Sequence, residues 1–246
     1  MDKKSNIYCL FEQSGTFKNA FKRAGFKKVI DVDIKNDFGE TDEFCNIFDD
    51  VELYYTTGNS PLMGRITKKD FVMAFYPCIY FSQFNGLYFT GKSNTYNGLS
   101  ECEKINKIIE RAEQRQYFYD ILLKFCWIVM ERKIPCIIEN PYSGANHYLY
   151  QNFPFEPKII DLNRNLHGDF YKKPTQYFCL NFEPNTQFNS IQKKYKAKKI
   201  NQISGHKFDC ACNVERSLIS PEYAFNFIND YILGKKTEKT EITLFN

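Results

Sequence analysis

The stretch NIYCLFEQSGTFKNAFKRAGFKKVIDVDI, residues 6–34, decides the fold. It opens with a short apolar run at 6–11, which is typical of a buried strand. After the turn EQSG, apolar residues recur at helical spacing over 16–24, and Gly25 is a typical helix end. A second apolar run then ends at Asp33. A strand, a helix and a strand within about thirty residues predict a parallel βαβ unit.

The rest of the chain continues this alternation and predicts an α/β domain with a mostly parallel sheet flanked by helices. Further strands are expected at 43–48, 71–75, 134–138 and 175–180, and further helices at 102–132, bent near 114–116, and at 221–233. The polar segments 53–68 and 84–99 are expected to be connections, and the second has the composition of a mobile loop.

Length and composition narrow the class of protein. At 246 residues, we expect residues 1–246 to form a single domain, with a small insert or recognition segment at about 176–205. Hydrophobic residues at 43% and charged residues at 25% exclude a wholly disordered chain and a membrane protein. The sequence shows no signal-peptide pattern and no apolar run of about 20 residues, which predicts a cytoplasmic protein without a membrane partner. We expect a monomer in which most of the nine cysteines are reduced.

Functional side chains are expected where the strands end, because open parallel sheets bind ligands at the carboxyl ends of their strands. Four such segments carry unusual residues: 12–15, 31–33, 76–78 and 139–141. In the first, a small residue and a glycine let backbone amides approach a ligand at a helix start. Together with an acid after the next strand, this turn suits an adenosine-type ligand, either a nucleotide cofactor or S-adenosylmethionine. An ordinary strand-to-helix turn is the alternative.

Two further residues suggest chemistry on an aromatic ring. Cys78 follows Pro77 in FYPCIYFS, and a thiolate fixed there could attack an electron-poor ring carbon if its pKa is lowered locally. Glu139 directly follows an apolar strand, and a desolvated carboxyl group there could give a proton to a ring nitrogen. Addition of a thiolate to a pyrimidine needs such a partner. The alternatives are a half-buried structural cysteine and a solvated glutamate.

The order of these segments resembles the cytosine carbon-5 DNA methyltransferase family, particularly its short phage-type members. The likeness lies in LFEQSGTFKNAFKRAGF, VIDVD, DFVMAFYPCIYFS and IENP, and more weakly in GDFYKKPTQYF and ERSLISPEYAFNFI, which together span about residues 6–232. It implies a Rossmann-like, S-adenosylmethionine-dependent methyltransferase fold with a reduced target-recognition region. It also implies methylation of carbon 5 of cytosine in DNA.

The resemblance gives a role to each residue that matches a family motif. The cofactor-binding residues would be Phe11, Gln13, Ser14, Gly15 and Pro77, with Asp31 holding the ribose and Asn46 and Ile47 flanking the adenine. Cys78 matches the nucleophile, which adds to carbon 6 of the base and makes carbon 5 nucleophilic. Glu139 matches the carboxyl group that steadies the base at its ring nitrogen, supported by Asn140. Because a base inside a duplex cannot reach such a pocket, a flipped cytosine or a single strand is implied.

Departures from the family leave other functions open. Its base-gripping Gln-x-Arg-x-Arg element is not recognisable, and Arg164, Lys172 or Lys173 could replace it, with Ser82 as a further substrate contact. The recognition region is also short. The chain could therefore modify RNA or a free nucleotide, deliver a different alkyl group, or bind a nucleotide or a host factor without catalysis. The lysine-rich segment 193–199 could contact phosphates or be a solvated face. The histidines show no metal-ligand spacing, so we expect no metal.

Overall fold

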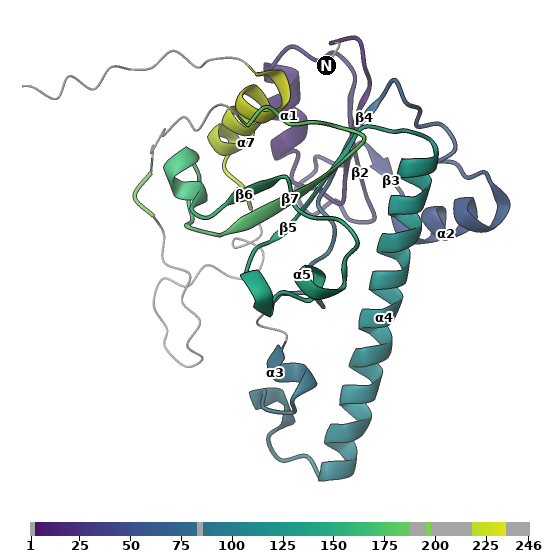
Figure 1. Ribbon diagram of the computed structural model, residues 1–246, viewed down its shortest axis with the longest axis vertical. Helices are drawn as coiled ribbons and strands as arrows, with labels where there is room; N and C mark the ends of the chain where they lie inside the picture. The colour runs from purple at the N-terminus through teal and green to yellow at the C-terminus, as the bar shows by residue number, and fades with distance from the viewer. Residues whose placement is uncertain (1–2, 83–85, 187–194, 198–217, 235–246) are drawn as a thin grey trace, which may run out of the picture.

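Seven strands of the described chain form one sheet (Figure 1). The computed structural model describes residues 3–82, 86–186, 195–197 and 218–234. The strands are β1 (Ile7–Leu10), β2 (Val29–Asp33), β3 (Glu43–Phe44), β4 (Phe71–Ala74), β5 (Cys136–Pro141), β6 (Ile159–Asp161) and β7 (Thr175–Leu180). Their order is β3-β2-β1-β4-β5-β7-β6, and only β7 runs antiparallel to its neighbours. The predicted α/β class with a mostly parallel sheet is confirmed, and the arrangement is compatible with a Rossmann-like fold.

Helices cover both faces of this sheet (Figure 1). They are α1 (Thr16–Arg23), α2 (Ile47–Thr57), α3 (Gly86–Phe89), α4 (Glu101–Glu131), α5 (Tyr148–Asn152) and α7 (Pro221–Phe227), which continues as a π-helix over Ile228–Leu233. Short 3-10 turns lie at Asn94–Tyr96, Gly144–Asn146 and Arg164–His167. Helices α1 and α7 contact each other on one face, and α2 and α4 contact each other on the opposite face.

The strand β1 shows why the two apolar layers form. Tyr8 and Leu10 pack into the cluster with α2 and α4, whereas Ile7 and Cys9 pack into the cluster with α1 and α7. Successive side chains of a strand point to opposite faces, so all four are buried. Burial of one large apolar side chain contributes about 1.5–3 kcal/mol. A strand covered on both faces therefore appears in the sequence as a continuous apolar run.

The helix α4 has 31 residues, and only its carboxyl-terminal part lies on the sheet, through buried residues such as Ile121, Phe125 and Val129. Its amino-terminal part projects beyond the sheet with α3 beside it (Figure 1). Ser100 begins the helix with a capping box, because its hydroxyl accepts the amide hydrogen of Glu103 and the Glu103 carboxylate accepts from Ser100. The projecting part therefore begins at a capped helix terminus.

Three local predictions from the sequence were wrong. The strand expected at 43–48 is only two residues long, because Asn46 accepts the Phe48 amide hydrogen and starts α2, which then covers the beginning of the expected connection at 53–68. The segment 84–99 contains α3 and a 3-10 turn. The helix α4 runs without a break through 114–116.

The expected insert at about 176–205 starts inside β7, a strand of the central sheet. Within that range, residues 187–194 and 198–205 lie outside the described part, as does most of the lysine-rich segment 193–199. In the part of the chain that the structure describes, no helix is both long enough and apolar enough to span a membrane.

Candidate active site

The expected site residues come together at the carboxyl edge of the sheet, around the point where the strand order reverses. Strands β1 and β4 are neighbours, while their successors β2 and β5 lie on opposite sides of this pair. Such a switch point leaves a crevice between the two loops that follow the central strands. The turn 11–15 follows β1, and the segment 75–78 follows β4. Glu139 and Asn140 lie near the end of β5, beside β4.

The turn after β1 has an unusual backbone. Phe11, Gln13 and Gly15 all have positive φ angles, of 62°, 42° and 65° respectively. At Gly15 a Cβ atom would lie 2.7 Å from Oε2 of Glu40, so a larger residue would be both strained and crowded. Positive φ at non-glycine residues is uncommon and often marks a functional turn.

Glu12, which the sequence analysis did not single out, organises this turn. Its carboxylate accepts the amide hydrogens of Phe17 at 2.5 Å and Lys18 at 3.3 Å, and the hydroxyl of Ser14 at 3.3 Å. The first amides of α1 are therefore already bound to a carboxylate of the chain itself. An acid just before a helix start is a recognisable capping signal and could have identified Glu12.

Asp31 lies beside Glu12 and has no exposed surface. Both of its carboxylate oxygens are buried, and within the described ranges no group donates a well-formed hydrogen bond to them. Burial raises the pKa of Asp31 to about 6, against the opposing charge of Lys18. Burial and then the charge of Asp31 raise the pKa of Glu12 to about 8. We call residues 11–15 together with Asp31 the acidic turn.

Asn46 and Ile47, which the resemblance places beside the adenine, have different environments in the structure. Asn46 is exposed at the start of α2, and its amide contacts Asp49 at 2.6 Å. Ile47 is 2% exposed and packs in the core, so its side chain does not line the crevice. Phe48, the next residue, is half-buried, with its ring centre 5.8 Å from that of Phe11. An aromatic surface beside the acidic turn thus comes from Phe11 and Phe48.

On the other side of the switch point, Asn140 joins the ends of β4 and β5. It is fully buried, and its Nδ2 donates to the carbonyl oxygen of Tyr76 at 3.0 Å. Pro77 and Cys78 follow directly, and both are half-buried. The Cys78 carbonyl oxygen accepts the amide hydrogens of Phe81 and Ser82, which closes a tight turn. Asn140 therefore fixes the backbone that leads to the thiol.

Glu139 is 8% exposed and lies next to a buried arginine. Its Oε1 is 3.9 Å from Nη1 of Arg164 and accepts no hydrogen bond from the described residues. Arg164 itself is completely buried and forms an ion pair with Asp169, also fully buried. Its Nη1 additionally donates to Oγ1 of Thr175 at 3.4 Å. Arg164 is thus a fixed cation behind Glu139, within the protein interior.

Cys78, Glu139 and Lys173 lie close enough for their charges to interact. Burial raises the pKa of the Cys78 thiol, the charge of Lys173 opposes this effect, and the charge of Glu139 adds to it. The thiol pKa is thus raised in the free protein, and the condition of a locally lowered pKa is not met. Lys173 is half-buried, whereas Lys172 is exposed. We call Cys78, Glu139, Arg164 and Lys173 the thiol cluster.

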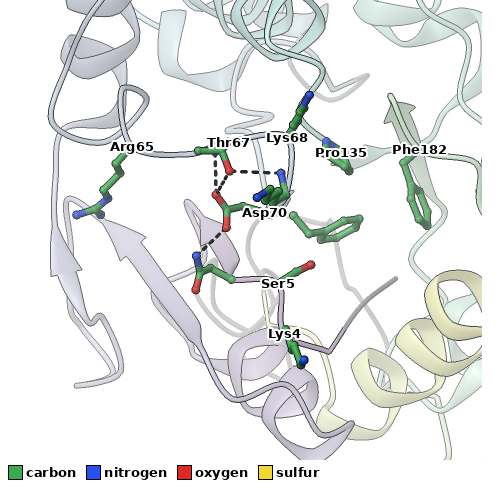
Figure 2. A pocket seen from close by; sticks show the side chains of 11 residues that line it. Lys4, Ser5, Arg65, Thr67, Lys68, Asp70, Pro135 and Phe182 are labelled. Carbon is green, nitrogen blue, oxygen red and sulfur yellow. Dashed lines mark hydrogen bonds between the residues drawn. The ribbon is translucent and has the colours of Figure 1, made fainter.

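Ser82 is half-buried and lines a separate cavity with residues of α3, α4 and α5. Another cavity, of about 690 Å³, lies at the opposite edge of the sheet, where Asn6 and Asp70 directly precede β1 and β4 (Figure 2). There the Asp70 carboxylate accepts from Asn6 at 2.7 Å and from Thr67 at 2.8 Å. Asn6, Thr67 and Asp70 thus bind one another, and we assign this contact a structural role.

Among the residues that the structure describes, no group of three or more His, Cys, Asp or Glu side chains is arranged to hold a metal ion. No protein-family model matches the sequence, and no curated protein matches it either. The geometry of the acidic turn and the thiol cluster is therefore the basis on which a function is proposed.

Proposed function

We propose that the protein is an S-adenosylmethionine-dependent methyltransferase that methylates carbon 5 of cytosine in DNA through a transient adduct with Cys78. One observation carries the proposal. A thiol after β4 and a carboxyl group near the end of β5 lie close together at the carboxyl edge of the sheet, and Asn140 joins the two strand ends at 3.0 Å. These are the two groups that addition to a pyrimidine ring requires.

Each residue of the thiol cluster would have a separate role in the proposed reaction. The Cys78 thiolate would add to carbon 6 of the base, while Glu139 would hold the ring nitrogen by a hydrogen bond. Arg164 would act as a positioning residue, because it is fully buried and held by Asp169 behind Glu139. Lys173 opposes the rise in the pKa of Cys78 and would favour its thiolate form when the base excludes water. Elimination of the thiolate after loss of the carbon 5 proton would release the product.

The acidic turn selects among adenosine-type ligands. A phosphate at the start of α1 would compete with the Glu12 carboxylate for the amides of Phe17 and Lys18, and it would face Asp31. A ligand with positive charge and hydroxyl groups would instead satisfy the two unpaired Asp31 oxygens. S-adenosylmethionine has a sulfonium, an ammonium and a ribose, and it would supply an electrophilic methyl group. Asp31 and Gly15 would hold its polar parts, and Phe11 and Phe48 its adenine.

The sheet supports the finer interpretation of the fold. The sheet is mostly parallel, with β4 beside β1 and an antiparallel β7 between β5 and β6, and is compatible with the Rossmann-like fold that the resemblance implies. The target cytosine would be flipped out or single-stranded, because a thiol at a sheet edge cannot reach carbon 6 inside a base stack.

A second candidate is a methyltransferase-like protein that binds its ligands without catalysis. The observation in its favour is the raised pKa of Cys78, because a neutral thiol is a poor nucleophile. The two candidates differ in whether a methyl group reaches a base.

The test is transfer of labelled methyl from S-adenosylmethionine to single-stranded and double-stranded DNA of AT-rich and GC-rich composition. We expect label on cytosine, its loss in Cys78→Ala, and its retention in the matched variant Cys45→Ala, which removes another half-buried thiol. An oligonucleotide with 5-fluorocytosine should stay attached to Cys78, because carbon 5 then has no proton to lose. Cofactor binding without transfer to DNA, RNA or free nucleotides would contradict the enzyme and favour the binding protein.

A further inference from the structure

A cavity of about 200 Å³ lies one turn beyond Cys78, between the projecting part of α4, α3 and α5. Residues that line it include Tyr80, Ser82, Phe89, Arg115, His147 and Tyr148. Most small-molecule pockets measure about 300–1,000 Å³, so this cavity has room for one chemical group and not for a whole cofactor. None of the described residues that line it is acidic.

Arg115 is the cation of this cavity. Its guanidinium carbon lies 3.9 Å from the ring centre of Phe89 and 4.6 Å from that of Tyr148. Within the described chain the guanidinium forms no ion pair and no hydrogen bond with protein groups. The two rings hold it in place, while its donors stay available to a planar or tetrahedral oxyanion.

His147 lies in the inner wall of the cavity. It is 1% exposed, and its Nδ1 accepts the amide hydrogen of Leu149 at 3.3 Å, so the ring proton is on Nε2. That Nε2 is buried, and no described residue accepts its hydrogen. A cavity that contains an arginine fork with available donors, and that no acidic side chain lines, fits a phosphate.

We propose that this cavity binds a backbone phosphate of the nucleic-acid strand next to the target nucleotide, with Arg115 donating to it. The turn that carries Cys78 continues directly into Tyr80 and Ser82 of the cavity wall. A strand held here would therefore pass the thiol. The inference rests on the proposed function only for the identity of the polymer.

The test is binding of a fluorescent single-stranded DNA octamer with one cytosine to the full chain, measured by anisotropy across a salt series. We expect Arg115→Gln to weaken binding about tenfold, since a charged hydrogen bond is lost. The slope of log K against log salt should fall by about 0.7, the value for one single-strand phosphate contact. The affinity of Arg115→Lys for the octamer should lie between the affinities of wild type and Arg115→Gln. The matched variant Arg111→Gln removes the same charge one turn away on α4, outside the cavity lining, and should change affinity less than about twofold.

Equal affinity and equal salt slopes for Arg115→Gln and wild type would overturn the proposal. So would Arg115-dependent binding of inorganic phosphate without any such dependence for the octamer, because the cavity would then be a free-anion site. The measurement needs no catalysis and is repeated in Cys78→Ala. If methyl transfer never occurs but the octamer still depends on Arg115, the phosphate site stands and the proposed reaction fails. If methylation occurs and Arg115→Gln binds like wild type, the reaction stands and the phosphate site fails.

Discussion

The acidic turn and the thiol cluster lie at the same edge of one sheet, but they balance charge in opposite ways. In the acidic turn, Glu12 and Asp31 are buried against each other, and the nearby cation, Lys18, is already paired with Glu40 at 3.0 Å and Asp42 at 3.4 Å. In the thiol cluster, Glu139 has the buried Arg164 behind it, and Lys173 acts on the same space.

This difference indicates which ligand each side fits. The acidic turn lacks an uncommitted cation and gains from a positive ligand. The thiol cluster combines a carboxyl group, a thiol and two cations, and it fits a neutral ring attached to a negative backbone. Two ligands of unlike charge can thus meet across the switch point, as a group transfer from a cationic donor to a nucleic acid requires.

The largest expected effect separates the two regions by function. Glu139→Gln should lower the rate of methyl transfer by about 10²–10⁴-fold, because the base loses its proton partner. The Kd of S-adenosylmethionine should change less than about twofold. The matched change Asp31→Asn should raise the Kd of S-adenosylmethionine about tenfold. The rate of methyl transfer at saturating cofactor should stay close to that of wild type. Single-turnover assays and calorimetry measure the two quantities. If both variants changed the transfer rate and the Kd equally, the thiol cluster and the acidic turn would not have separate functions.

The next effect concerns the buried arginine that distinguishes the thiol cluster. Arg164→Met should lower the free energy of unfolding by about 3–5 kcal/mol, because the buried carboxylate of Asp169 loses its partner. Arg23→Met is the control, since the ion pair of Arg23 with Glu222 is at the surface, and should cost about 1 kcal/mol or less. Urea unfolding measures both. A similar cost for the two variants would mean that Arg164 is not held as described.

A smaller effect should appear as a pH dependence of the acidic turn. The pKa of Glu12 in the folded state is about 8 and that of Asp31 about 6, both above their ordinary values. Groups with raised folded pKa values stabilise the protein most at low pH, and this contribution is lost as pH rises through those values. Wild type should therefore lose unfolding free energy as pH rises between about pH 5 and 8.5.

Glu12→Gln should remove most of this loss, because the amide oxygen still accepts from Phe17 but no longer ionises. The exposed Glu113→Gln serves as the control. Conversely, a cationic cofactor should bind more tightly as pH rises from 6 to 8 and release protons as it binds. A pH-independent affinity would argue against a cation in the acidic turn.

Local patterns in the sequence were sufficient for the βαβ unit and for the placement of Cys78 after β4. Glu139, expected directly after a strand, instead lies inside β5, because β5 continues to Pro141 by pairing with β7. Apolar runs and helical spacing are local signals, and parallel strands bring their carboxyl ends to one edge. The burial of each side chain was not predictable from local patterns. Arg164, offered as a contact to the base, is fully buried. Ile47, expected beside the adenine, packs in the core because it is the first residue of α2, after the N-cap Asn46.

Glu12 and His147 were missed for a related reason. A glutamate in a turn and a histidine after a strand usually appear solvated or structural in a sequence, because burial depends on what packs over them. Glu12 is buried by α1 and Asp31, and His147 by the turn beyond Cys78 and by β7, where Gln176 lies 3.4 Å from its Nδ1. Such tertiary contacts join segments far apart in the chain, and no local pattern encodes them.

The smallest expected effect tests whether the backbone of the acidic turn is as constrained as its charges. Gly15→Ala places a Cβ on a residue with φ of 65° and 2.8 Å from Cβ of Glu40, so it should cost about 1–2 kcal/mol of unfolding free energy. Gly58→Ala is matched in φ, at 78°, but meets no atom within 4 Å, so it should cost only the conformational part, about 1 kcal/mol. Thermal unfolding of the two variants measures the difference. Gly15→Ala and Gly58→Ala could also lower the unfolding free energy equally. The Glu40 side chain would then move away from the added methyl group without cost, and the buried carboxyl groups, rather than close packing around Gly15, would stabilise the acidic turn.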